Sequence, residues 1–245
     1  MIQTQNIFFE MSKATVFRDL SLIDYKEAWD YQEELFDEVL KSKQANSDLP
    51  AEEKKLSNNY LLFCEHPHVY TIGKSGKEQN MLLDMIQLQA KNATFHKINR
   101  GGDITYHGPG QIVGYPILNL ETYDMGIKNY IYNLEQAIIN CIADYGLEGH
   151  RLDGATGVWL DIDKPTVRKI CAIGVRVSRW VSMHGFAFNV NTDLDYFGYI
   201  NPCGFQDKGV TSLKKELGKE LDIEDVKHNL KNHIANLFDM TFKND

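Results

Sequence analysis

The sequence predicts an α/β or α+β fold, in which a mixed, largely antiparallel sheet is flanked by helices within a single domain spanning residues 1–245. Two observations carry this prediction. Apolar runs of β type fill the middle of the chain, and two amphipathic helical segments, at 24–43 and 126–146, lie among them without strict alternation. The chain has no internal repeat, low-complexity segment or Gly/Ser linker, which favours one domain over two.

The N-terminal part begins with a predicted strand at residues 14–23, followed by the first helix. Asp24 begins this helix, Glu27 stands at the capping-box position, and an apolar face continues to about residue 43. The polar stretch 44–59 is predicted to be an exposed loop, and strands follow at 60–65 and 69–73.

His66 and His68 lie between these strands and could bind a metal. Without a nearby carboxylate a structural role is favoured, and no metal site is predicted.

The C-terminal part is predicted to alternate irregularly between strands and helices. A strand is expected at 112–120, and the strongest helix at 126–146, where apolar residues including Cys141 recur at helical spacing. Strands at 158–160, 169–177 and 181–190 come next. Residues 193–209 are irregular in composition, residues 210–213 open a short helix, and 223–238 form the last helix.

Composition and charge limit the function classes. The net charge of −8 argues against a broad nucleic-acid interface, which needs a basic surface. None of the four cysteines, Cys64, Cys141, Cys171 and Cys203, lies at CxxC spacing, so a zinc site is not predicted and reduced thiols are expected. The chain shows no signal peptide and no run of about 18 apolar residues. We therefore expect a cytoplasmic protein with no membrane partner.

A dodecapeptide at residues 100–111 combines four glycines and one proline with side chains that bind or react. Apolar β-type runs at 95–98 and 112–115 flank it. Glycine lets a backbone approach a ligand closely or adopt a positive φ. The segment is either a strand–turn–strand unit lining a pocket or a tight hairpin between two core strands, and its own residues favour neither.

Two cysteines are candidate nucleophiles. Cys203 lies between Pro202 and Gly204, in a turn that could display its thiol, whereas Cys171 follows Lys169 on the same face of a predicted strand. A thiol needs a nearby cation to lower its pKa from about 8.5, and a desolvated lysine could also move protons. A cysteine among apolar strand residues usually serves packing. Strand periodicity does not decide between Cys171 and Cys203.

Three blocks together resemble the lipoyl(octanoyl) transferase family, the octanoyl-acyl carrier protein:protein N-octanoyltransferases. The blocks are residues 100–111, residues 169–176 continuing through Trp180 to 184–190, and residues 201–204 followed by 209–213. Weaker similarity lies at 66–73 and 156–159. The resemblance covers residues 15–215 in the family's order, without a departure at the catalytic positions.

The resemblance implies the fold of the biotin and lipoate ligase catalytic domains and a cysteine–lysine mechanism. Cys203 is implied to be the nucleophile that carries the octanoyl thioester, and Lys169 to lower its pKa and act as acid and base. Cys171 is then left with a packing role. The implied substrate-binding residues are Arg100, Gly101, Gly102, Asp103, Ile104, Thr105, Tyr106, His107, Ala172, Ile173, Gly174, Gly185, Phe186 and Ala187.

The resemblance also implies the partners. The donor is octanoyl-acyl carrier protein, and the acceptors are lysines on the lipoyl domains of 2-oxoacid dehydrogenase complexes and on the glycine cleavage H protein. No cofactor is implied, because the incoming thioester is already activated. Two rival functions remain. An ATP-dependent lipoate–protein ligase would need no cysteine nucleophile, and a non-catalytic lipoyl-domain or acyl-binding module would not need Lys169 beside Cys203.

Overall fold

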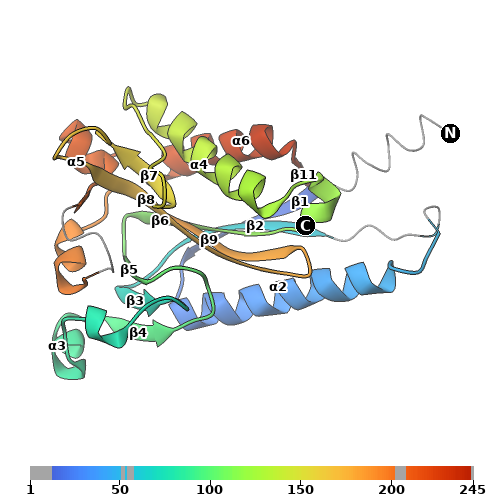
Figure 1. The fold of residues 1–245 in the computed structure, drawn as a ribbon, viewed down its shortest axis with the longest axis horizontal. Helices are drawn as coiled ribbons and strands as arrows, with labels where there is room; N and C mark the ends of the chain where they lie inside the picture. Colours follow the sequence, from blue (N-terminus) through green and yellow to red (C-terminus); the bar gives the residue numbers. More distant parts are fainter. Residues whose placement is uncertain (1–12, 51–52, 54–57, 202–207, 244–245) are drawn as a thin grey trace.

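Two sheets organise the chain in the computed structural model, which describes residues 13–50, 53, 58–201 and 208–243 (Figure 1). The large sheet contains β1 (Ala14–Leu22), β2 (Asn59–Glu65), β6 (Gln111–Ile117), β7 (Gly157–Leu160), β8 (Arg168–Ser178), β9 (Val181–Asn189), β10 (Gly209–Val210) and β11 (Thr241–Lys243). Its strand order is β10-β8-β9-β6-β2-β1-β11, with β7 also paired to β8. The strands β2, β6, β9, β8 and β7 pair antiparallel in turn, whereas β1 is parallel to β2 and β11, and β10 is parallel to β8. The predicted mixed, largely antiparallel sheet is confirmed.

Helices cover both faces of the large sheet. Figure 1 shows α2 (Tyr25–Ala45) on one side and α4 (Ile127–Ala143) with α6 (Ile223–Phe238) on the other. The sequence of β2 explains this arrangement, because Leu61 and Phe63 pack in the core of α4 and α6 while its alternate residues pack against α2. Asp24 caps α2 as predicted, accepting from the backbone N–H of Lys26 at 2.7 Å. Among the described residues, no helix is long and apolar enough to cross a membrane.

A second, three-stranded sheet was not predicted. It consists of β3 (Val69–Ile72), β4 (Thr94–Lys97) and β5 (Ile104–His107) in the order β4-β3-β5. The connection from β3 to β4 contains η2 (Glu78–Asn80) and α3 (Met85–Ala90), and Leu88 of α3 packs in the core of this sheet. Three further short helices lie elsewhere: η3 (Leu120–Tyr123), η4 (Leu194–Tyr199) and α5 (Leu213–Leu217).

The dodecapeptide connects the two sheets. Its middle forms β5 in the small sheet, and its last residue, Gln111, begins β6 in the large sheet. The hairpin alternative is therefore wrong, because the strands before and after the segment belong to different sheets. Gly110 turns the chain between them at a φ of 78°, and its N–H donates to Oε2 of Glu65 at 2.6 Å.

A two-residue turn joins β8 to β9, and both of its residues have a positive φ. The values are 50° for Arg179 and 65° for Trp180. The carbonyl of Arg179 accepts from Nζ of Lys43 at 2.6 Å, and that of Trp180 accepts from the N–H of Leu120 at 2.8 Å. Distant parts of the chain thus hold this turn.

Candidate active site

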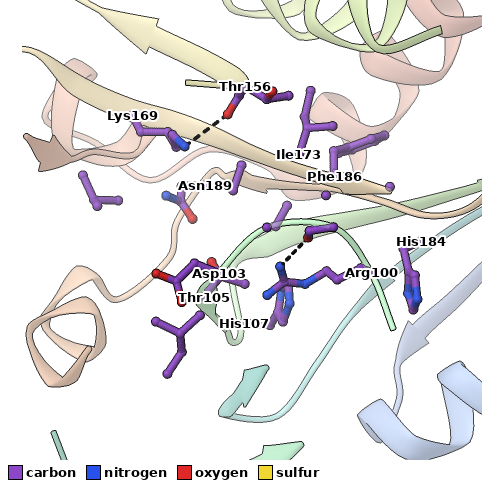
Figure 2. A pocket seen from close by; sticks show the side chains of 18 of the residues that line it. Arg100, Asp103, Thr105, His107, Thr156, Lys169, Ile173, His184, Phe186 and Asn189 are labelled. Carbon is purple, nitrogen blue, oxygen red and sulfur yellow. Dashed lines mark hydrogen bonds between the residues drawn. The ribbon is translucent and has the colours of Figure 1, made fainter. Parts of the chain in front are cut away.

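A cavity of about 640 Å³ is lined from both sheets. Figure 2 shows Lys169 and Asn189 on one side of it and the dodecapeptide, with Arg100, Asp103 and His107, on the other. Nearly all the predicted site residues line it: Arg100, Gly101, Gly102, Asp103, Ile104, Thr105, His107, Lys169, Ala172, Ile173, Gly174, Gly185, Phe186 and Ala187. The predicted nucleophile, Cys203, lies outside the described residues. Asn201 and Lys208, which flank residues 202–207, both line the cavity.

Lys169 projects from β8 into an environment that favours its neutral form. Its ammonium donates to the carbonyl of Thr156 at 3.1 Å and lies 4.5 Å from the centroid of the Trp159 ring (Figure 2). Burial lowers the pKa of Lys169 to about 8, while the nearby Cys171 and Glu135 side chains oppose this decrease. A lysine with this pKa can both donate and accept a proton close to neutral pH.

A buried carboxylate on α4 holds the segment beside Lys169. Glu135 accepts from the N–H of Gly157 at 2.9 Å and from Nε of Arg151 at 3.1 Å. Gly157 directly follows Thr156, whose carbonyl accepts the hydrogen bond from the Lys169 ammonium. Glu135 is therefore a positioning residue, because it fixes the backbone to which the lysine is bonded and adds negative charge near it.

Cys171 lies in the core and away from the cavity. Strand alternation predicted that Lys169 and Cys171 share a face, and the structure contradicts this prediction. The register of β7 on β8 shifts between Val158, which is opposite Cys171, and Trp159, which is opposite Lys169. Cys171 is fully buried in the core beneath α4 and does not line the cavity. Burial raises the pKa of its thiol well above the ordinary value, so a thiolate is disfavoured there.

Arg100 fastens the dodecapeptide to the small sheet. Its guanidinium is buried and donates to the carbonyl of Thr71 at 2.8 Å, to Oγ1 of Thr71 at 3.0 Å and to the carbonyl of Gly101 at 2.9 Å. The N–H of Gly101 donates in turn to the carbonyl of Val175 on β8 at 3.0 Å. These bonds tie the loop to both sheets and set the width of the cavity between them.

The polar residues of the dodecapeptide have structural partners. Asp103 accepts from Nδ2 of Asn80 at 3.0 Å, so it fixes the loop. His107 is buried, and its Nδ1 donates to Oε1 of Gln111 at 2.9 Å. Burial, together with nearby positive charge, holds the pKa of His107 well below its usual value, so this imidazole is neutral. At neutral pH, Lys169 is the better placed acid among these residues.

Tyr106 is the exception among the predicted substrate-binding residues. It is fully buried in the core of the small sheet and does not line the cavity. Its hydroxyl is 2.7 Å from Nδ1 of His68, and its ring stacks on Tyr196 of η4. Because Tyr106 alternates with Thr105 and His107 along β5, it faces the opposite side of that strand.

His66 and His68 point to different partners. Nδ1 of His66 donates to the carbonyl of Ile23 at 2.8 Å, its Nε2 accepts from the hydroxyl of Tyr115 at 2.7 Å, and His68 stacks on Tyr196. In the described part of the chain, no group of three or more His, Cys, Asp or Glu side chains could hold a metal.

Several cavity residues had no role in the sequence prediction. Asn189 ends the apolar run of β9, where it accepts from Nε2 of Gln111 at 2.8 Å and donates to the carbonyl of Thr211 at 3.0 Å. A polar residue closing a fully buried strand is a signal that could have identified it. Thr156 acts through its carbonyl, and nothing in the sequence could have revealed that contact.

Known proteins are similar to this chain along most of its length. The profile of the lipoyl protein ligase A/B catalytic domain matches residues 24–235. The chain is 53% identical to an octanoyltransferase of Christiangramia forsetii over 95% of its length and 99% of the relative. It is 56% identical to an octanoyltransferase of Flavobacterium psychrophilum, with 94% of this chain and 99% of the relative covered.

Solved structures share the fold at low sequence identity. A bipartite lipoate protein ligase of Thermoplasma acidophilum superposes with a TM-score of 0.67 at 15% identity, over 95% of this chain and 86% of that one. A lipoate-protein ligase A bound with ATP gives a TM-score of 0.64 at 15% identity, over 95% of this chain and 87% of that one. The expected ligase-like fold is confirmed.

Proposed function

We propose that this chain, which belongs to the lipoyl protein ligase A/B catalytic-domain family and is an octanoyltransferase of protein lipoylation, works through an acyl-enzyme. The residue that carries the acyl group in this proposal is Cys203. In this proposal the donor is octanoyl-acyl carrier protein. The acceptor is a lysine on the lipoyl domain of a 2-oxoacid dehydrogenase complex or on the glycine cleavage H protein.

The first half-reaction loads the enzyme. The sulfur of Cys203 attacks the donor's thioester carbonyl while neutral Lys169 takes the thiol proton. The carbon–sulfur bond of the donor breaks, and the Lys169 ammonium returns that proton to the departing thiolate of the carrier. The products are octanoyl-Cys203 and free carrier thiol.

The second half-reaction forms the amide. The neutral ε-amine of the acceptor lysine attacks octanoyl-Cys203 and loses a proton to Lys169. The bond between the acyl carbon and the cysteine sulfur breaks, and Lys169 passes the proton to that sulfur. Both halves require a group that takes and returns a proton near neutral pH, which fits a lysine whose pKa is lowered to about 8.

The position of Lys169 carries this proposal. It combines a lowered pKa with a place in the cavity wall that the dodecapeptide shares. Among the rivals, an ATP-dependent ligase has less support, because the ligases share only the fold, at 15% identity, whereas the relatives at 53% and 56% identity are octanoyltransferases. A binding module without activity would have no use for a lysine with this pKa.

Intact-mass spectrometry tests the proposal directly. After mixing with octanoyl-acyl carrier protein, the chain should gain the mass of one octanoyl group without ATP, and peptide mapping should place it on Cys203. Cys203→Ala should show no adduct. Cys171→Ala is the matched control and should keep the adduct, because that thiol is buried in the core.

Two results would contradict the acyl-enzyme mechanism. One is full transfer to a lipoyl domain by Cys203→Ala, and the other is transfer that depends on ATP and free octanoate. The second result would establish ligase chemistry instead.

A further inference from the structure

A row of small apolar residues crosses the floor of the cavity from strand to strand. Ala172 of β8 is opposite Ala187 of β9, and Ala187 is in turn opposite Val113 of β6. All three residues line the cavity. Neighbouring strands lie about 4.8 Å apart, so the row spans about 10 Å from β8 to β6. An extended eight-carbon chain is about as long as this row.

The row begins beside Lys169, where the cavity is open. Gly157 is opposite Ala172, and it follows Thr156, whose carbonyl accepts from the Lys169 ammonium. Thr156 is exposed and lines the cavity. An acyl chain whose thioester reacts next to Lys169 can therefore extend along the row toward Val113.

Buried side chains close the far end of the row. Val113 is opposite Cys64 of β2, the next strand of the sheet. His66, just after β2, packs its ring against that of Tyr25 with 5.1 Å between the centroids. Tyr25 and Tyr115 both line the cavity here, and both are buried. Tyr25 thus lies beyond Val113, at the end of the path that starts at Lys169.

Tyr25 is held firmly, and its hydroxyl has no partner in the described part of the chain. It is the first residue of α2, directly after the Asp24 cap, and its ring stacks on His96 at 5.6 Å and on His107 at 5.7 Å. Tyr25 is only 2% exposed, and its hydroxyl forms no hydrogen bond with any described residue. Burial raises the pKa of Tyr25, so the hydroxyl stays protonated. Buried hydroxyls are normally hydrogen-bonded, so this one is available to a group that enters the cavity.

We propose that the Tyr25 hydroxyl limits the length of the acyl chain that the enzyme transfers. This inference rests on the proposed function. An octanoyl chain fills the apolar row and ends before the hydroxyl. A longer alkyl chain reaches the hydroxyl, excludes water from it and offers no hydrogen bond in return, which weakens binding. A chain of that greater length with a terminal hydroxyl can hydrogen-bond to Tyr25 and avoids this penalty.

Three acyl groups on the same acyl carrier protein test this role. They are octanoyl, decanoyl and ω-hydroxynonanoyl, of which the last two are equally long and differ only in a terminal methyl or hydroxyl group. Intact-mass spectrometry follows the initial rate at which each acyl group is transferred to the chain. The wild type should take decanoyl about tenfold more slowly than octanoyl, as expected when a buried hydroxyl is left unpaired. It should take ω-hydroxynonanoyl faster than decanoyl.

Tyr25→Phe removes the hydroxyl and keeps the ring. This variant should raise the ratio of the decanoyl rate to the octanoyl rate about tenfold, and ω-hydroxynonanoyl should lose its advantage over decanoyl. Tyr130→Phe is the matched control, because Tyr130 is also a buried tyrosine on a helix but does not line the cavity. Its rate ratios should equal those of the wild type. Equal thermal unfolding temperatures establish that both variants are folded.

Three outcomes would overturn the inference. The wild type could take decanoyl as fast as octanoyl, it could prefer decanoyl to ω-hydroxynonanoyl, or a folded Tyr25→Phe variant could keep the wild-type ratios. The first two need no variant, so they decide the matter even if Tyr25→Phe does not fold. Each of the three leaves octanoyl loading of the wild type in place, and the proposed function with it. A wild type that gains no octanoyl group would instead remove both proposals.

Discussion

Lys169 shows how far a single residue could be interpreted before its surroundings were known. Its place in an apolar strand indicated an unusual lysine, and the resemblance of its sequence block implied a catalytic one. Burial lowers its pKa, and the groups nearest to it are a carbonyl, an indole ring and a carboxylate from other elements. Glu135 belongs to a helix 34 residues earlier in the sequence, and no local pattern links the two. The lysine and the desolvation that lowers its pKa could be predicted, whereas the identity of the groups around it could not.

Two substitutions at Lys169 should distinguish what its positive charge contributes to the reaction from what its proton transfer contributes. Lys169→Met should lower the rate of octanoyl transfer about a thousandfold, the usual contribution of a general acid and base. Lys169→Arg keeps the cation but does not release a proton at any ordinary pH, so transfer should be equally slow. The rate at which iodoacetamide alkylates Cys203 distinguishes the two variants, because this rate depends on the thiolate that a nearby cation stabilises. Of the two variants, only Lys169→Arg should keep the fast alkylation of the wild type. Transfer at the wild-type rate in Lys169→Arg would show that proton transfer by this residue is not needed.

At the scale of the elements, the pairing of β6 with β9 forms the cavity wall. Gly114 of β6 is opposite Phe186 of β9, and Gly185 lies next to them. The family resemblance implied that Gly185 is a substrate-binding residue. The structure adds a second reason for glycine at this position, because a Cβ there would lie 2.1 Å from the backbone oxygen of Gly114. Backbone atoms within a paired sheet have little freedom to move away.

Gly185→Ala should therefore destabilise the protein, by about 2 kcal/mol in the free energy of unfolding, as overpacked cores commonly do. Urea unfolding followed by circular dichroism measures this. Gly198→Ala is the control, because a Cβ at Gly198 meets no atom within 4 Å, and the change should stay within about 0.5 kcal/mol. Equal stability of the two variants would show that β6 and β9 can separate to accept the methyl group.

For the molecule as a whole, the sequence predicted the large sheet and its helices better than the small sheet. The last helix has the predicted bounds, and Asp24 caps α2 as expected. Both depend on local signals, namely a cap and a helical repeat. The small sheet depends on β5, four residues enclosed by glycines, whose partner β3 lies more than thirty residues earlier. The pairing of short strands over such distances has no local signature, and for this reason the residues of the dodecapeptide are compatible with a hairpin as well as with a cavity wall.

The joining of the two sheets buries histidines in their neutral form. Burial lowers the pKa of His66 to about 4 and that of His184 to about 3, and it also holds the pKa of His107 well below the ordinary value. In the unfolded chain each titrates near about 6.5. Protons therefore bind the unfolded state more strongly below that pH. The stability that these residues contribute is complete above about pH 6.5 and is lost as the pH falls toward the folded-state values.

Acid should accordingly weaken the fold before most carboxylates titrate. The free energy of unfolding should fall between about pH 7 and about pH 5, by about 1 kcal/mol per pH unit for each buried histidine. Urea unfolding at several pH values measures this slope. His66→Gln should reduce the slope, whereas His228→Gln should leave it unchanged, because His228 is exposed. A free energy of unfolding that stays level over this range would contradict the prediction.

The turn at Arg179 and Trp180 bears on how the chain could be divided into fragments. Two-residue hairpin turns with positive φ values usually contain glycine or asparagine, and each other residue adds a cost of about 1 kcal/mol. Neither residue type is present here. The tie to Lys43 and the bond from Leu120 offset that cost, and both come from outside the hairpin. A peptide containing only β8 and β9 would lack these two hydrogen bonds. The register of β8, the strand that carries Lys169, on β9 therefore depends on residues outside the hairpin.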